Sequence, residues 1–278
     1  MIDAICAMSS MQHQQILSIA RAGNPARAWA LFHSSGLNAR RDDPKALTLK
    51  GRLLKDQAKV VHGADRSRLY GEAADAYAAA AELERDSYPL INAAALALLG
   101  GKPERARSLA QEALALIEGD PDQGENIYWR EATKAEALLL LGDEAGARAA
   151  LAGGISKLPY AWEDHAATIG QFALILAEQG RNAAWLDRHR PPPSLYFSGI
   201  IGLDHDDRMI AAEIDAIIER EKPGFGFGAL AAGADILIAE ALHKAGAELH
   251  VTLPYPVERF RELSVVPFGD HWGARFDA

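Results

Sequence analysis

The stretch 224–254 contains residue types that could bind an anion. Glycines stand at positions 224, 226, 228 and 233, and a helix is expected to begin near Ala234, with Asp235 in its first turn. Glycine lets the backbone come close to a ligand, and a helix N-terminus presents unpaired N–H groups with a partial positive charge. Phosphate suits such a site. The same glycines also allow segments to pack closely without a ligand, and the residues alone leave both interpretations open.

The segments around this turn predict alternating strands and helices. Ser194–Ser198 reads as a strand, Asp207–Lys222 as a helix, and Ala247–Leu253 as a short strand that Pro254 ends. The glycine-rich segment between them adds a further short strand and the helix from Ala234. Strands that alternate with helices pair in parallel through right-handed crossovers, so we expect the beginning of a Rossmann-like sheet.

The ligand crevice of an open parallel sheet lies at the carboxyl ends of its strands. The residues predicted to bind a ligand there are Ser198, Gly199, Arg208, Gly226, Gly228, Ala229, Gly233 and Asp235. Arg208 could meet a phosphate if its loop folds over the crevice, although an arginine at such a turn is more often a solvated surface residue. The strict dinucleotide fingerprint and the GxxxxGK[ST] loop are absent, so the pattern does not fix the nucleotide.

Length and charge restrict the class of protein. A chain of 278 residues is long enough for two domains. Its formal charge of −9 argues against general affinity for nucleic acid or anionic membranes. Its one cysteine, Cys6, excludes an internal disulfide and is compatible with a reducing compartment. Without an apolar run of membrane-spanning length or a signal-peptide pattern, we expect a cytoplasmic protein.

The chain up to about residue 189 is rich in alanine and leucine and has helical periodicity. Gly23, Gly101 and Gly142 are each followed, five residues later, by an alanine within the next helix, where a small side chain allows helices to approach closely. This spacing is typical of helical-hairpin repeats of the tetratricopeptide kind. The predicted antiparallel pairs cover residues 12–36, 44–82, 87–117 and 126–157, with a closing helix at 161–179.

The predicted domain organisation follows from these patterns. Residues 1–187 form an α-helical repeat domain, 188–193 (RHRPPP) a proline-stiffened linker, and 194–278 a small Rossmann-like domain. The fold class is therefore α plus α/β. A doubly wound sheet normally has two more strands, so the second domain is expected to be incomplete. Either the chain is a fragment of a longer signalling protein, or a partner covers the open sheet edge. The sequence does not show whether Ala278 is the natural end.

The helical part resembles a known family. The blocks 88–100 (YPLINAAALALLG) and 128–143, with Tyr128-Trp129 and the leucines before Gly142, are similar to the tetratricopeptide-like TRAFs-binding region. That region occurs in apoptosis-signal-regulating kinases and in many bacterial signalling proteins. The resemblance covers about residues 40–180 and implies a regulatory scaffold that binds protein.

The second part resembles another group. Residues 228–254 look like the SLOG group of Rossmann domains, which is related to Smf/DprA and LOG proteins. By this resemblance Ser198, Gly199, Gly228 and Gly233 would line the phosphate end of a nucleotide site, in a chain that often precedes a nucleotide cyclase or another effector. The PGGxGTxxE signature of LOG-type phosphoribohydrolases is absent, and Glu240 is not an obvious equivalent of its glutamate.

Other polar clusters have simpler interpretations. Asp204-His205-Asp206-Asp207 offers possible metal ligands, but helix capping by Asp206 or Asp207 is the simpler explanation. The nine histidines lack HxH or HExxH spacing, and there is no GxSxG elbow, so we predict neither a metal site nor catalytic residues. His250 is expected to be packed in its strand. Core packing is the preferred interpretation of the tryptophans of the helical part, Trp29, Trp129, Trp162 and Trp185.

The function predicted from these observations is a signalling or sensor module. Its repeats would bind a protein partner, and its Rossmann-like domain would bind a nucleotide and so regulate an effector. No cofactor is predicted other than this nucleotide ligand. Two alternatives stay open: a LOG-like hydrolase of nucleotide N-glycosidic bonds, and a non-catalytic adaptor that docks or forms a homodimer.

Overall fold

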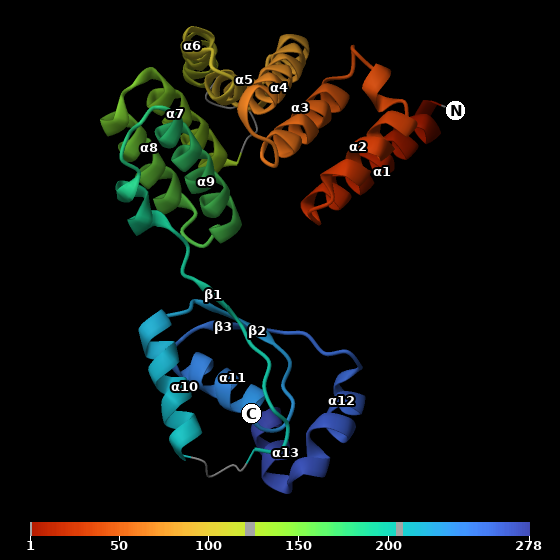
Figure 1. Cartoon of the computed structure of the whole chain (residues 1–278), viewed down its shortest axis with the longest axis vertical. Coiled ribbons are helices and arrows are strands. Elements are labelled where there is room, and N and C mark those ends of the chain that lie inside the picture. Colours follow the sequence, from red (N-terminus) through yellow and green to blue (C-terminus); the bar gives the residue numbers. More distant parts are fainter. Residues whose placement is uncertain (1, 120–125, 204–207) are drawn as a thin grey trace. The chain divides into compact units, whose positions relative to one another are not determined.

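The computed structural model divides the chain into two compact units, residues 1–189 and 190–278 (Figure 1). It describes residues 2–119, 126–203 and 208–278. The point of division falls within the predicted linker, 188–193. Each unit has its own hydrophobic core.

The first unit is built from helices in antiparallel succession. They are α1 (Ile2–Arg21), α2 (Pro25–Ser34), α3 (Pro44–Ala58), α4 (Gly63–Glu84), α5 (Ser87–Leu99), α6 (Pro103–Gly119), α7 (Ile127–Leu141), α8 (Glu144–Lys157) and α9 (Trp162–Glu178), with 3-10 turns η1 (Leu37–Ala39) and η2 (Ala184–His189). The predicted pairs 44–82, 87–117 and 126–157 therefore agree with the structure within a few residues. The first predicted pair, 12–36, corresponds to α1 and α2, but α1 begins at Ile2 and not near residue 12.

Short polar residues determine where several of these helices start. The Asp43 carboxylate accepts hydrogen bonds from the backbone amides of Lys45 and Ala46, and Pro44 occupies the first helical position of α3. Asp86 caps α5 through the amide of Tyr88 in the same way. A cap of this kind satisfies amides that have no partner within the helix, and proline there loses no hydrogen bond.

The glycine and alanine repeat has the structural role that the sequence suggests. Gly101 and Gly142 adopt left-handed backbone conformations, with φ of 77° and 92°, in the turns between paired helices. The alanines five residues after each turn, Ala106 and Ala147, are buried, at 2% and 0% exposure. The turn reverses the chain, and the small side chain lets the two helices of each pair pack closely.

Consecutive helices pack against one another from α3 to α8, and α5, α7 and α9 also contact each other directly. The main hydrophobic cluster of the unit is shared by α4 to α9, and it contains Leu139, Phe172 and Ile175. A second cluster is centred on α3, α4 and α5 and includes Tyr70 and Tyr77. The second cluster joins α3 to α5, and a hydrogen bond from Lys55 to Gln171 joins α3 to α9. We therefore group α3, α5, α7 and α9 as the inner layer of the unit, and α4, α6 and α8 alternate with them along the chain.

The second unit contains a small parallel sheet with helices. Its elements are β1 (Ser194–Tyr196), α10 (Arg208–Glu221), β2 (Phe225–Gly228), α11 (Ala234–Lys244), β3 (Glu248–Val251), α12 (Val257–Ser264), η3 (Val266–Phe268) and α13 (Asp270–Asp277). The strands pair in the order β1-β2-β3, with Leu195 opposite Gly226 and Gly226 opposite Leu249. The predicted succession of strand and helix is confirmed, and α12, η3 and α13 follow β3.

The strand order explains why helices cover only one face of this sheet. It does not reverse within the described sheet, whereas a doubly wound sheet reverses at the point where its ligand crevice lies. Successive right-handed crossovers in one direction place their helices on the same side, and α10 and α11 lie together there (Figure 1). Leu195 and Leu249 pack against Ile218 and Leu242 on this side.

The opposite face of the sheet carries aromatic side chains. Tyr196, Phe227 and His250 are register partners on the three strands, and their rings stack in a row. Ring centroids are 5.0 Å apart between Tyr196 and Phe227 and 4.6 Å apart between Phe227 and His250. Tyr196 is 78% exposed. His250 was predicted to be packed; it stacks on Phe227 but stays exposed on this face.

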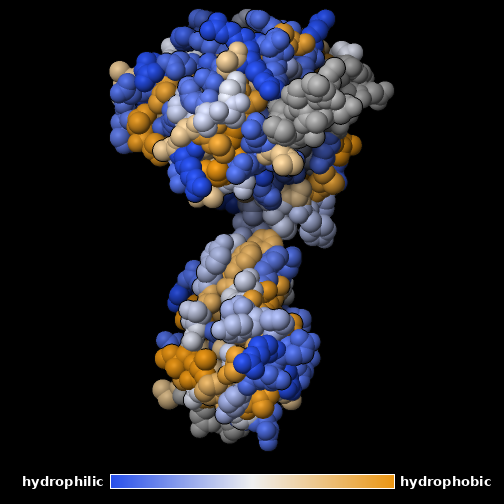
Figure 2. Space-filling view, turned by 90° about the vertical axis from the view of Figure 1, so that its right-hand side faces the viewer, coloured by the Kyte–Doolittle hydropathy of each residue, from blue (hydrophilic) through white to orange (hydrophobic). Residues whose placement is uncertain are grey.

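Hydrophobic residues are interspersed with hydrophilic ones on the face of each unit that Figure 2 presents. In the described part of the chain, no helix is both long enough and apolar enough to cross a membrane.

Candidate functional site

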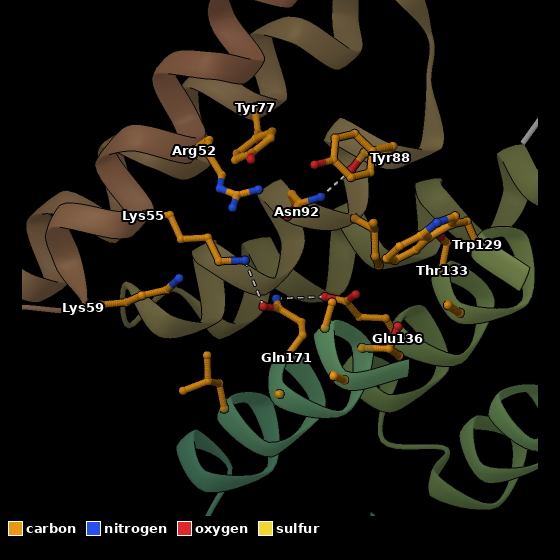
Figure 3. A pocket seen from close by; sticks show the side chains of 17 residues that line it. Arg52, Lys55, Lys59, Tyr77, Tyr88, Asn92, Trp129, Thr133, Glu136 and Gln171 are labelled. Carbon is orange, nitrogen blue, oxygen red and sulfur yellow. Dashed lines mark hydrogen bonds between the residues drawn. The ribbon is translucent and has the colours of Figure 1, made fainter. Parts of the chain in front are cut away.

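A pocket of about 520 Å³ opens within the first unit, between α3, α4, α5, α7 and α9 (Figure 3). This volume falls in the range of small-molecule sites. Polar and aromatic side chains line it where these helices otherwise bury alanine and leucine. The helices hold the Cα atoms of these residues at fixed helical spacing.

One wall of the pocket is cationic. Arg52 and Lys55 lie on α3 and Lys59 is its C-cap residue; their spacing of i, i+3 and i+7 places them on the same face of the helix. Arg52 Nε lies 3.3 Å and Lys59 Nζ 2.8 Å from the carboxylate of Asp56. Two of the three cations therefore share a single carboxylate, which belongs to their own helix.

A chain of hydrogen bonds crosses the bottom of the pocket. Lys55 Nζ donates to Gln171 Oε1 at 3.0 Å, and Gln171 Nε2 donates to Glu136 Oε1 at 3.1 Å (Figure 3). The amide of Gln171 thus lies between an ammonium on α3 and a carboxyl on α7. Protein atoms surround both charged groups on most sides, and each keeps part of its surface open to the pocket.

Burial changes the protonation of both end groups. Desolvation lowers the pKa of Lys55 to about 8, although the nearby Glu136 opposes this change. Desolvation also raises the pKa of Glu136 to about 7, opposed by the charge of Lys55 and the hydrogen bond from Gln171. Both groups therefore titrate close to neutral pH.

Aromatic rings form the side of the pocket opposite the cations. Tyr88 on α5 and Trp129 on α7 lie there, and Asn92 lies between the tyrosine and the cationic wall (Figure 3). Tyr88 is 41% exposed, and its ring meets Tyr77 edge-on at 6.4 Å. Cations facing exposed aromatic rings can bind a ligand that carries both an anionic group and a flat apolar group.

Sequence reasoning missed almost all of this pocket. Trp129 was assigned to core packing, but it lines the pocket; Trp29 and Trp185 do pack against the hydrophobic clusters. A pattern that could have indicated the site is the spacing of Trp129, Thr133 and Glu136, which places three polar or aromatic groups on one face of α7.

The predicted glycine turn lies at the carboxyl edge of the sheet. Glycines in and near this turn pack so closely against neighbouring residues that a side chain would collide with them. A Cβ at Gly226 would lie 2.5 Å from the Leu242 side chain, and one at Gly228 2.5 Å from the ring of Phe197. A Cβ at Gly199 would overlap that of Ala234. These three glycines therefore allow the close packing of the strands and α11, which was one of the two interpretations that the sequence left open.

The side chain of Asp235 is hydrogen-bonded to two backbone amides of the turn. Its carboxylate accepts from the N–H of Gly199 at 2.6 Å and from that of Ala231 at 3.3 Å, and the residue is 6% exposed. Burial raises the pKa of Asp235, and the two hydrogen bonds oppose this change. The chain's own carboxylate thus binds amides that a ligand phosphate could otherwise use.

The remaining predicted ligand-binding residues have different surroundings. Ser198 is exposed just after β1, and Ala229 packs at the edge of a hydrophobic cluster after β2. Gly233 precedes α11 with φ of 104°, and the amide of Ala234 donates to the carbonyl of Ile200 at 3.2 Å. The structure therefore brings Ser198, Gly199, Gly228, Ala229 and Gly233 to the same edge.

Part of the predicted site lies outside the residues that the structure describes. Arg208 is the first residue of α10, and its side chain is not among those described; Asp204-His205-Asp206-Asp207 lies outside the described residues. The Glu240 carboxylate is bound by Arg275, whose Nε lies 2.7 Å from it. Within residues 2–119, 126–203 and 208–278, no group of three or more His, Cys, Asp or Glu side chains is placed to hold a metal ion.

The N-terminal part of the helical unit is similar to a known protein family. Residues 2–97 match the family model described as Tetratricopeptide Repeats-Sensor. The match extends from α1 through most of α5 and does not include the second unit. No curated protein matches the chain. The N-terminal region is therefore tetratricopeptide-like, and the family indicates a sensor or signalling scaffold with a protein partner.

Proposed function

We propose that the protein is a signalling sensor in which the helical-repeat unit binds a protein partner and the second unit binds a nucleotide, so that ligand binding regulates an effector. The observation that carries this proposal is the match of residues 2–97 to sensor repeats. Arrays of this kind present extended surfaces that commonly bind protein. The inner layer of α3, α5, α7 and α9 is the surface that we assign to recognition.

The nucleotide part of the proposal rests on the edge of the small sheet. Ser198 and Gly199 follow β1, Gly228 ends β2, and Gly233 precedes α11, so these residues meet where a parallel sheet commonly binds its ligand. Because Asp235 already binds the amides of Gly199 and Ala231, the phosphate would have to lie outside them, near the exposed hydroxyl of Ser198. The SLOG resemblance supports this placement.

A thermal-shift screen of the full chain against mono-, di-, tri- and cyclic nucleotides tests the nucleotide part, because a ligand selective for the native state raises its stability. Ser198→Ala and Arg208→Ala should each weaken a specific shift. Gly228→Val is a poor test, since its side chain would collide with the ring of Phe197. If no nucleotide changes the stability of the folded second unit, this part of the proposal is wrong.

The face of the sheet opposite α10 and α11 favours a second candidate function, an adaptor that docks through the second unit. The row of Tyr196, Phe227 and His250 is an exposed aromatic surface on the side that α10 and α11 do not cover. Aromatic residues are enriched at protein interfaces. Sedimentation analysis over a range of concentrations would reveal a homodimer, and Tyr196→Ser should weaken it. A monomer at all concentrations argues against self-association through this face.

A further inference from the structure

The pocket of the first unit contains more positive charge than its lining residues neutralise. Among the lining residues that the structure describes, Arg52, Lys55 and Lys59 are cations, and Glu136 is the one carboxylic acid. Asp56 pairs with Arg52 and Lys59 from their own helix. The hydrogen-bond partner of Lys55 is the neutral amide of Gln171. An anion that enters the pocket would therefore be attracted by the wall formed by α3.

Lys55 is the centre of this attraction. Its ammonium has lost much of its hydration, and a neutral amide compensates this loss less well than an anion does. Its position is fixed by the contact with Gln171 on α9, so the charge is already oriented before a ligand arrives. A preoriented, partly desolvated cation at the bottom of a pocket is the kind of group that binds phosphate or carboxylate strongly.

The opposite wall selects for a second chemical feature. The exposed ring of Tyr88 and the half-buried ring of Trp129 face the cationic side across a space of about 520 Å³. Aromatic side chains of this kind stack on flat rings, and the energy of such stacking depends little on which base is present. Asn92 lies between the two walls and could form hydrogen bonds with the polar edge of a ring.

We propose that this pocket binds a small anion that carries a planar base, of the nucleoside phosphate class, with its phosphate at Arg52 and Lys55 and its base at Tyr88 and Trp129. The site lies wholly within the first unit and does not depend on the nucleotide site proposed for the second. It would give the repeat unit a small-molecule ligand in addition to its protein partner. Because five helices line the pocket, a bound ligand would connect α3 with α5, α7 and α9 and stabilise one arrangement of the recognition surface.

The test is calorimetric titration of the full chain with a set of nucleoside monophosphates, and with the corresponding nucleosides and inorganic phosphate separately. We expect the complete nucleotides to bind more tightly than either component. Lys55→Met and Arg52→Ala should each weaken the binding by about tenfold, since each removes one charge-assisted contact. Trp129→Phe should reduce the change in tryptophan fluorescence that accompanies binding.

Arg68→Ala is the matched control, because Arg68 is an exposed cation on α4 that pairs with Glu72 and Asp65 outside the pocket. It should leave the affinity unchanged. Circular dichroism of every variant shows whether the helical unit is folded, and Arg52→Ala, at the rim, keeps the test valid if Lys55→Met does not fold. Absence of binding by any nucleoside phosphate overturns the proposal.

The two nucleotide proposals fail in different ways. If the pocket variants lose binding and Ser198→Ala retains it, the ligand binds in the first unit and the site in the second unit is wrong. If Ser198→Ala loses binding and the pocket variants retain it, the present inference is overturned. Two stoichiometric sites, each sensitive to its own variant, would support both.

Discussion

Lys55 on α3 donates a hydrogen bond to the side-chain oxygen of Gln171 on α9, at 3.0 Å, although 116 positions separate the two residues in the chain. The other end of the same amide donates to Glu136 on α7. One neutral side chain therefore links three helices and lies between two ionisable groups of opposite charge. It holds the ammonium and the carboxyl in place without direct contact between them.

The first prediction concerns this link. Gln171→Leu keeps a side chain of similar size but leaves both Lys55 and Glu136 without their hydrogen-bond partner in a poorly hydrated site. We expect the free energy of unfolding of the helical unit to fall by about 1–3 kcal/mol. Urea unfolding followed by far-UV circular dichroism measures this change.

Gln111→Leu provides the control for this substitution, since Gln111 is an exposed glutamine on α6. Its effect should stay within about 0.5 kcal/mol. Equal losses in the two variants would show that the hydrogen bonds of Gln171 contribute nothing particular to stability.

Local physical rules made much of the helical unit predictable. A glycine with positive φ ends one helix, a capping residue or proline starts the next, and an alanine five residues after the glycine packs in the pair, as at Gly142 and Ala147. Each of these rules involves neighbours in the sequence. The predicted ranges of three pairs and of the closing helix therefore agree with the structure.

The pocket could not be predicted in the same way, because it depends on contacts between distant helices. Lys55, Glu136 and Gln171 each resemble a polar residue on a solvated helix face when only the sequence is considered. The bare aromatic sheet face was also missed, since it depends on the order of the strands. The rings of Tyr196 and Phe227 become neighbours only when β1 and β2 pair in register.

The second prediction is a pH dependence of anion binding in the pocket. Lys55, with a pKa of about 8, loses its positive charge as the pH rises, and Glu136, with a pKa of about 7, gains a negative charge. Both changes disfavour an anion, whereas a phosphate monoester is already doubly charged above a pH of about 6. The affinity for a nucleoside monophosphate should therefore fall by about tenfold or more between about pH 7 and pH 9.

Titration calorimetry in buffers of different ionisation enthalpy provides an independent measurement, because anion binding should be accompanied by proton uptake near pH 8. In Glu136→Gln, the carboxylate that raises the pKa of Lys55 is gone, so the decrease in affinity should begin at a lower pH. An affinity independent of pH between 7 and 9 would exclude Lys55 as the anion contact.

The third prediction concerns the carboxylate that braces the glycine turn. Asp235→Ala leaves the part-buried hydrogen bond of the Gly199 amide and the buried one of the Ala231 amide without their acceptor, which should destabilise the second unit by about 1–3 kcal/mol. Hydrogen exchange measured by mass spectrometry should show faster exchange in the peptides that contain these two amides. Asp215→Ala is the control, because Asp215 is exposed and pairs with Lys244 at 3.1 Å. Similar exchange in both variants would contradict a bracing role.

The last prediction separates backbone conformation from close packing at the turn before α11. Gly233 has φ of 104°, and an added Cβ would lie 2.5 Å from the carbonyl oxygen of Ile200. Gly246 also has a positive φ, 79°, but its Cβ would meet nothing within 4 Å. Backbone strain at such positions costs roughly 1–3 kcal/mol, so both alanine variants should be less stable than the parent.

Gly233→Ala should be the less stable of the two, because the carbonyl that its Cβ would meet belongs to the bridge between Ile201 and Gly233 and cannot move without disturbing it. Hydrogen exchange over residues 194–278 compares the variants directly, and the helical unit serves as an internal reference. If Gly246→Ala destabilises the unit as much as Gly233→Ala does, contact with Ile200 is not what requires glycine at position 233. A larger effect at Gly233 would mean that loss of ligand binding in this variant cannot be attributed to the ligand site alone.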